Sequence, residues 1–253
     1  MFAKGSLFSK GISNNNELSE DVKNHLVQVY LSLTLTIFTA IIGILINLLL
    51  NFGGIFPLLL SFGLLFYLKL DQDKSNTALK RRLSILGLFG FLNGSSIGPL
   101  IRQALLIENG ELLVFISLLC TMAIFISFTL SAKYSKRRSF LYLGAFLGSA
   151  LNMMGVLTLV SIFVPSLSFM FVRIYGGLLL FSGFVIYDTQ IIIEQAFEGN
   201  RDVVGHALCL FLDFVNIFIR VLIILTRKGE RRDNGGGSIL PRFRKSGGDV
   251  FDL

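Results

Sequence analysis

The feature that most constrains this chain is a series of long apolar runs with almost no charge inside them. A bilayer core about 30 Å thick needs roughly 20 apolar residues to be crossed by a helix. Runs of about this length recur along the sequence, at residues 28–50, 51–69, 83–105, 112–132, 139–163, 169–193 and 207–226. The sequence therefore predicts a helical membrane protein with about seven hydrophobic segments.

Composition and charge agree with this prediction. Hydrophobic residues make up 53% of the 253 positions and charged residues only 15%. A soluble domain of this size needs more polar surface to cover its core, so a membrane protein is expected. The net charge is +7. In a membrane protein such an excess of Lys and Arg usually lies at the cytoplasmic ends of the spans, so we expect membrane lipids and not nucleic acid as partners. Two separated cysteines give neither a disulfide framework nor a zinc pattern, and no cofactor is expected.

Lys and Arg predict the orientation, because short cytoplasmic loops carry an excess of both. With the N-terminus inside, the N-terminal segment and residues 69–82, 133–138 and 194–206 together hold thirteen basic residues. The opposite loops hold only Arg102 and Arg173. The N-terminus and the basic loops are therefore expected in the cytoplasm.

The basic residues near the C-terminus leave the last segment with two interpretations. Seven full crossings put the tail outside, whereas six crossings and a re-entrant segment keep it inside. The charge rule favours the second, but a seventh helix buried among the others also tolerates Asp213 and Arg220. We expect an all-α bundle of six transmembrane helices around a seventh, central or re-entrant C-terminal helix. A polar cytoplasmic N-tail (1–27) precedes this membrane domain (28–226), and a basic, Gly-rich, disordered C-tail (227–253) follows it.

Glycines at a spacing of four residues indicate where helices approach closely. Small residues in such rows let helix backbones meet in lipid, where no hydrophobic force drives association. They occur on the third and fifth segments, at Gly90, Gly94, Gly98, Gly144 and Gly148. We predict a packing seam on each of these segments.

Three charges lie well inside the apolar segments: Asp188, Asp213 and Arg220. Each costs roughly 2.5–3.5 kcal/mol at a helix centre, so each needs a partner or a task. Asp188 lies near the end of the sixth segment and Asp213 near the start of the last one. At 1.5 Å per residue, both lie about 9 Å below the same surface. Two consecutive antiparallel helices can therefore bring the two carboxylates side by side.

Two carboxylates in a low-dielectric site share a proton or hold a cation between them. Arg220 follows Asp213 by seven residues and lies on the same helix face, so it is a candidate basic partner. The three residues resemble a proton- or cation-sensitive latch. The alternative is a hydrogen-bonded pair that only fixes helix packing, and the spacing leaves both open.

A pair of membrane aspartates is also what an intramembrane aspartyl protease requires. Tyr187-Asp188 resembles the first half of its signature, but the second half, a Gly-x-Gly-Asp run, is absent at Asp213. We therefore predict no enzyme and no catalytic residue. A further interpretation is a non-conducting membrane scaffold that binds cell-death or stress regulators.

Five ordered motifs resemble the Bax-inhibitor-1 family. They cover its first-helix entry, its third helix, its basic loop with the start of the fifth helix, its sixth helix and its last helix. The motifs lie at residues 25–30 (HLVQVY), 90–100 (GFLNGSSIGPL), 136–144 (KRRSFLYLG), 184–194 (FVIYDTQIIIE) and 210–214 (LFLDF). The resemblance covers about residues 20–228.

This resemblance implies an endoplasmic-reticulum membrane protein that suppresses stress-induced cell death. It also implies a pH-sensitive calcium leak, with Asp188 and Asp213 as the sensor and as a calcium site, and cell-death regulators or stress sensors as partners. One departure concerns the basic latch. Some relatives place an Arg on the second helix, whereas here that helix has only Lys69, at its end, so Arg220 is our candidate.

Overall fold

The computed structural model describes residues 20–51, 53–71, 76–135, 142–164 and 166–233. The regular structure of these residues is entirely helical. In chain order the helices are α2 (Glu20–Leu50), α3 (Ile55–Leu70), α4 (Asn76–Leu105), α5 (Gly110–Tyr134), α6 (Leu143–Phe163), α7 (Leu167–Phe171), the π-helical turn η1 (Val172–Gly176), α8 (Gly177–Phe197) and α9 (Val203–Asp233). Helix α7, the turn η1 and helix α8 follow one another without a break and form one continuous helical segment, Leu167–Phe197. The predicted all-α class is confirmed.

Six helices among the described residues are long and apolar enough to cross a membrane, and α3, with 16 residues, is shorter. The helices extend past the predicted membrane domain, from Glu20 to Asp233. An apolar run marks only the part of a helix that lies in lipid, and the helix continues into the polar interface. In α2, acidic Glu20 and Asp21 occupy the first turn, where they complement the helix dipole. The rest of each predicted tail, residues 1–19 and 234–253, lies outside the described residues.

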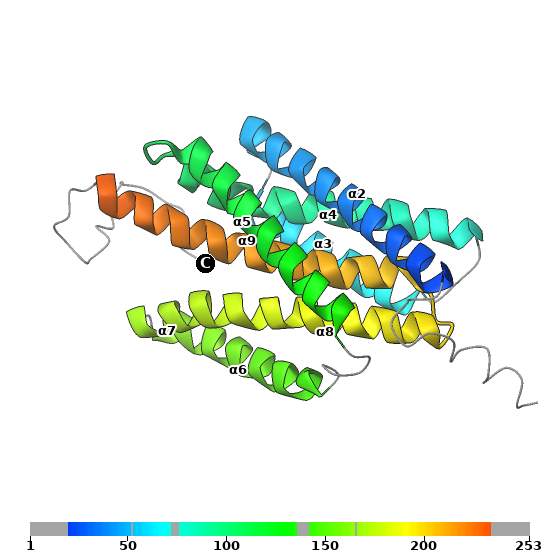
Figure 1. Cartoon of the computed structure of the whole chain (residues 1–253). Helices are drawn as coiled ribbons and strands as arrows, with labels where there is room; N and C mark the ends of the chain where they lie inside the picture. Colours follow the sequence, from blue (N-terminus) through cyan, green and yellow to red (C-terminus); the bar gives the residue numbers. More distant parts are fainter. Residues whose placement is uncertain (1–19, 52, 72–75, 136–141, 165, 234–253) are drawn as a thin grey trace, which may run out of the picture.

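One end of the bundle collects the starts of α2, α4 and α9 and the end of α8 (Figure 1). Two ion pairs connect these elements. Arg82 Nη2 lies 2.9 Å from Asp202 Oδ2, and Arg201 Nη2 lies 3.1 Å from Asp21 Oδ2. The Lys and Arg pattern predicts that this end is cytoplasmic, and we call it the basic end.

Helix α9 runs the length of the bundle without a break and packs against α2, α4, α5 and α8. Its far end contacts elements opposite the basic end. Arg227 Nη2 donates to Met170 Sδ on α7 at 2.5 Å, and Gly229 lies beside Ile107 and Leu113 at the α4–α5 connection. An unbroken helix of this length favours a full crossing over a re-entrant segment. That α9 is the central helix of the bundle stays a prediction.

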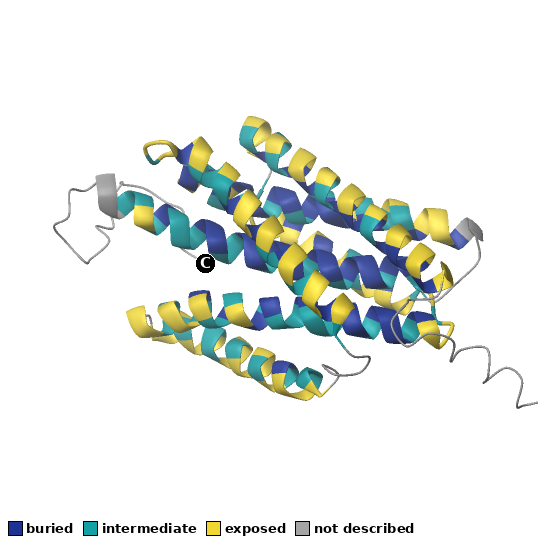
Figure 2. Ribbon diagram, viewed as in Figure 1, coloured by how far each residue is buried: buried dark blue, intermediate teal, exposed yellow. Residues whose placement is uncertain are grey.

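The helices differ strongly in burial (Figure 2). In α9, 56% of the apolar span is buried, whereas in α6 only 6% is buried. The core includes Phe89 of α4 and Phe211 of α9, whose rings meet edge to face with centroids 5.8 Å apart. The exposed apolar residues of α6 form a surface suited to lipid tails.

The glycine row of α4 packs against α2. A Cβ at Gly90 would lie 2.6 Å from the Thr36 carbonyl oxygen, and one at Gly94 would overlap the Ala40 carbonyl. At Gly98 the added atom would meet the side-chain amide of Asn47. The predicted seam on the third segment therefore coincides with a close backbone contact.

The fifth segment follows the prediction only in part. A Cβ at Gly144 would meet the ring of Tyr187 on α8, but one at Gly148 would have no neighbour within 4 Å. Within the described residues Gly148 has no packing partner, so a contact there stays a prediction. The contact stripe continues at Leu147, which lies over Gly183 of α8, so it advances by three residues and not by four.

Candidate functional site

The two membrane aspartates meet between α8 and α9. These helices are antiparallel neighbours joined by a short connection, which brings Asp188 and Asp213 to the same depth. Their carboxyl groups lie close enough to interact, although no hydrogen bond of standard geometry joins them. Asp213 is buried, at 4% exposed, and Asp188 is half-buried. The Oδ2 atom of Asp213 has no hydrogen-bond partner among the described residues. Two carboxyl groups this close repel each other when both are ionised, so the contact fits a shared proton.

Lys69, at the end of α3, is the cation that acts on this pair. Its charge favours the ionised form of Asp188, and its Nζ lies 4.0 Å from Cys209 Sγ, one turn before Asp213 on α9. The Lys69 side chain is exposed. Although Lys69 lies at the end of its helix, its flexible four-carbon side chain extends the charge well beyond its backbone position.

Arg220 makes its contacts elsewhere. Its Nη1 donates to the Asn216 carbonyl oxygen at 2.7 Å and to Asn216 Oδ1 at 2.9 Å. The guanidinium carbon lies 4.5 Å from the ring centroid of Phe181 on α8, and the group covers Gly177. Within the part of the chain that the structure describes, no ion pair joins Arg220 to Asp213 or Asp188. The predicted latch role of Arg220 thus finds no contact here, although the residue does join α8 to α9.

A second polar cluster lies at the basic end, where the two histidines of the chain meet. His25 Nε2 of α2 lies 2.9 Å from His206 Nδ1 of α9, and His206 Nε2 lies 2.9 Å from Gln195 Oε1 of α8. Both histidines are buried, at 3% and 7% exposed. One of the facing nitrogens must carry a hydrogen and the other must accept it. The cluster links the beginning of the bundle to the α8–α9 connection.

Asp202, which precedes α9, joins α4 to this cluster. Burial alone would raise the pKa of Asp202, but the Arg82 hydrogen bond, the Gly205 N–H and the Arg82 charge together hold it below its ordinary value. Arg82 is itself buried, at 5% exposed. A buried guanidinium with an ionised partner fixes the start of α9 against α4 at neutral pH.

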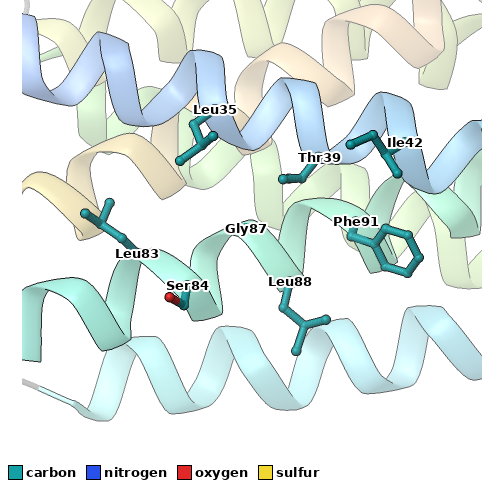
Figure 3. A pocket seen from close by; sticks show the side chains of 8 residues that line it. All are labelled: Leu35, Thr39, Ile42, Leu83, Ser84, Gly87, Leu88 and Phe91. Carbon is teal, nitrogen blue, oxygen red and sulfur yellow. The ribbon is translucent and has the colours of Figure 1, made fainter.

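Two hollows open on the outside of the bundle, away from the aspartates. One has a volume of about 470 Å³ and lies between α2 and α4, where Leu35, Ile42, Leu88 and Phe91 give it apolar walls (Figure 3). Its few hydroxyl groups bond to carbonyls of their own helices. The other, of about 480 Å³, lies where α2 and α5 both pack on α8, and it has basic and polar walls. The first suits lipid tails alone.

Within the described ranges, no group of three or more His, Cys, Asp or Glu side chains is placed to hold a metal ion. A calcium ion at Asp188 and Asp213 would therefore take only its carboxylate ligands from the pair. Calcium accepts six to eight oxygen ligands, so water would supply most of the remainder. Such a site is weak and suits passage more than storage.

Sequence reasoning considered Lys69 but preferred Arg220, and it missed the two histidines. A signal for the histidines existed. The chain has two, at the starts of the first and the last apolar segments, and the topology predicts both starts at one end. No comparable signal marks Lys69, because its partners lie on α8 and α9, far away in sequence.

Comparison with known proteins shows close relatives over most of the chain. A family model described as "Inhibitor of apoptosis-promoting Bax1" matches residues 22–230. "Probable Bax inhibitor 1" of Paralichthys olivaceus is 37% identical over 212 residues, which are 83% of this chain and 88% of the relative. "Bax inhibitor 1" of Arabidopsis thaliana is 35% identical over 223 residues, 88% of each chain. That of Homo sapiens is 34% identical over 83% of this chain and 88% of its own length. These relatives are named as inhibitors and not as enzymes.

Proposed function

We propose a function from one premise: this chain belongs to the Bax inhibitor 1 family of membrane proteins. Membership implies suppression of cell death. We propose that the chain acts in the endoplasmic-reticulum membrane as a pH-sensitive calcium leak, with Asp188 and Asp213 as the sensor. The observation that carries this proposal is the contact of the two carboxyl groups between α8 and α9.

In this mechanism the shared proton holds α8 against α9 in a closed state. Removal of the proton leaves two negative charges side by side in a mostly buried site, and their repulsion pushes the helices apart. The closed state binds the proton more tightly than the open state does. Acid therefore favours closing of this latch, and alkali favours opening.

Calcium adds an opposing effect. In an open state the ionised pair would attract the ion, and acid would displace it by protonating the same oxygens. Both effects act through the two carboxyl groups. The pair therefore controls the pH response whichever of them dominates.

The test is calcium efflux from proteoliposomes of the purified full chain across pH 6–8. The variants are Asp188→Asn, Asp213→Asn and the double change. Because the two residues act as one unit, we expect either single change to flatten the pH response and the double change to add little. If all three variants keep the wild-type pH profile, the pair is only structural and the mechanism is wrong.

The second candidate is a non-conducting scaffold that binds cell-death or stress regulators. The names of the relatives, which refer to Bax, favour it. The same liposomes distinguish the two candidates. A leak gives efflux above that of protein-free liposomes at some pH in this range, whereas a scaffold gives none at any pH.

A further inference from the structure

The crevice formed by α2, α5 and α8 differs chemically from the rest of the lipid-facing surface. Lys23 of α2 and Lys133 of α5 stand at its mouth, and Thr189 of α8 lies on its floor. Its volume is about 480 Å³, and its lining contains no acidic residue. We call it the α2–α5 crevice.

The two lysines come from helix ends that meet at the basic end. Lys23 lies in the first turns of α2 and Lys133 in the last turn of α5, and both side chains are exposed. Among the residues that the structure describes, neither forms an ion pair. The nearest acidic residue to Lys23 in sequence, Asp21, already pairs with Arg201. The mouth of the crevice is thus a site of uncompensated positive charge at the membrane surface.

Below the lysines lie three hydroxyl groups, of Tyr30, Thr129 and Thr189. The Tyr30 hydroxyl interacts with those of both threonines, yet none of the three makes a hydrogen bond of standard geometry within the described chain. Thr189 is only 1% exposed. Buried hydroxyls are nearly always satisfied, so this enclosed cluster behind the crevice wall leaves hydrogen bonds for a polar group that enters the crevice, after small side-chain rotations. By helix rise the hydroxyls lie roughly 6–10 Å below the lysines.

The outer rim of the crevice is apolar. Val27 and Leu31 of α2 are 56% and 65% exposed, and they lie on the lipid-facing side of the helix. From the surface inward, the crevice therefore presents positive charge, then hydroxyl donors, with an apolar wall beside them. A phospholipid presents its phosphate, its ester carbonyls and its acyl chains in the same order.

We propose that the α2–α5 crevice binds one anionic phospholipid from the cytoplasmic leaflet. The phosphate lies between Lys23 and Lys133, the ester carbonyls accept hydrogen bonds from the buried hydroxyls, and the acyl chains lie along Leu31. Basic pockets between transmembrane helices on the cytoplasmic side are established places for anionic headgroups. This site is independent of the calcium leak, because none of its groups belongs to the aspartate pair.

The absence of Trp from the chain allows a direct test. A single Trp introduced as Leu31→Trp reports the neighbouring lipid by its quenching in vesicles that contain brominated phosphatidylserine or brominated phosphatidylcholine. Leu151→Trp, on the exposed face of α6 at a similar distance from its helix start, is the control for general enrichment near a basic end. We expect the serine lipid to be preferred several-fold more at position 31 than at position 151.

Three further variants distinguish a specific binding site from general surface charge. In the Leu31→Trp background, Lys133→Gln should reduce the preference about fivefold, the effect of one lysine near the surface. Lys80→Gln, which removes one exposed charge at the same end from α4, should leave it unchanged. The double change Tyr30→Phe and Thr189→Val, which removes no charge, should also reduce the preference.

The outcomes are decisive. The proposal is overturned if the preference for the serine lipid is equal at positions 31 and 151. It is also overturned if that preference is unchanged after the two hydroxyls are removed, because general surface electrostatics then explains it. Millimolar inorganic phosphate, against sulfate at equal ionic strength, distinguishes a lipid from a free anion. Quenching that survives phosphate supports the lipid, and quenching abolished by it overturns the lipid assignment. Thermal unfolding of each variant confirms that it is folded before its quenching is compared.

Discussion

The α2–α4 interface and the α8–α9 interface hold the bundle together by different means. Along α2 and α4 the backbones approach so closely that only glycine fits at Gly90, Gly94 and Gly43, the last of which faces the Phe91 carbonyl from the α2 side. Between α8 and α9 the contacts are made by polar side chains, at Asp188–Asp213 and Gln195–His206. The first interface contains no group that titrates at these positions, and the second does.

The difference indicates where the molecule can change state. A glycine seam has one tight arrangement, because packed interiors resist small displacements. A pair of acids has two states, with and without the shared proton, and these differ in the repulsion between the helices. Any proton-dependent movement is therefore expected at α8–α9, while α2 and α4 move as one body.

The largest effect should come from filling the seam. Gly94→Leu places a side chain where even a Cβ overlaps the Ala40 carbonyl. Backbone cannot yield as a flexible side chain does, so the cost should exceed the roughly 1–3 kcal/mol of ordinary overpacking. We expect loss of the folded, monodisperse protein in detergent, measured by size-exclusion chromatography and thermal unfolding. Position 148 has open space around it, so Gly148→Leu should have a free energy of unfolding within about 0.5 kcal/mol of the wild-type value. Equal behaviour of the two variants would mean that α2 and α4 are not closely packed at Gly94.

A smaller effect is expected where the two regions are joined. Asp202→Asn keeps the side-chain oxygen that accepts from Gly205 N–H but leaves Arg82 buried without an ionised partner. We expect a loss of about 3 kcal/mol in unfolding free energy, at the lower end for broken buried pairs because Asp202 is 29% exposed. Asp21→Asn breaks the exposed pair with Arg201 and should cost less than about 1 kcal/mol. Thermal unfolding at neutral pH measures both.

The pH dependence of this loss has a defined sign. The pKa of Asp202 is lowered in the folded protein, so its contribution is present above the unfolded pKa and disappears as pH falls through the folded one. The difference between wild type and Asp202→Asn should be constant from pH 8 to pH 5 and shrink below about pH 4. A difference that grows on acidification would show that Arg82 is not stabilised by an ionised Asp202.

The two interfaces also differ in how much of each could be predicted from the sequence. The α4 glycine row was readable because a helix repeats its face every three to four residues. The role of Gly43 could not be predicted, since a single glycine in an apolar run carries no periodic signal. At Gly148 the spacing alone does not show which side of α6 has a neighbour, and α6 contacts mainly α8.

At α8–α9 the aspartate pair followed from equal depths on consecutive helices. Its cationic partner, Lys69, could not be predicted in this way, because the depth of a backbone position says little about the reach of a lysine side chain. The same limit applies to the α2–α5 crevice. Its lysines and hydroxyls lie on three helices, and no local pattern in the sequence brings them together.

The smallest predicted effect distinguishes the two candidate cations of the pair. Lys69 acts on Asp188, whereas Arg220 is engaged with Asn216 and Phe181. Removal of a nearby positive charge makes ionisation of the pair less favourable, so Lys69→Gln should move the midpoint of the calcium-efflux response to higher pH. Because Lys69 is exposed and screened, an interaction of roughly 0.5 kcal/mol and a shift of about 0.4 pH unit are expected. Lys80→Gln, at the same end of the bundle, should leave the midpoint unchanged. Arg220→Gln should alter stability but not the midpoint. If the midpoint moves with Arg220→Gln and not with Lys69→Gln, the pair senses the charge on its own helix, and the assignment of Lys69 is wrong.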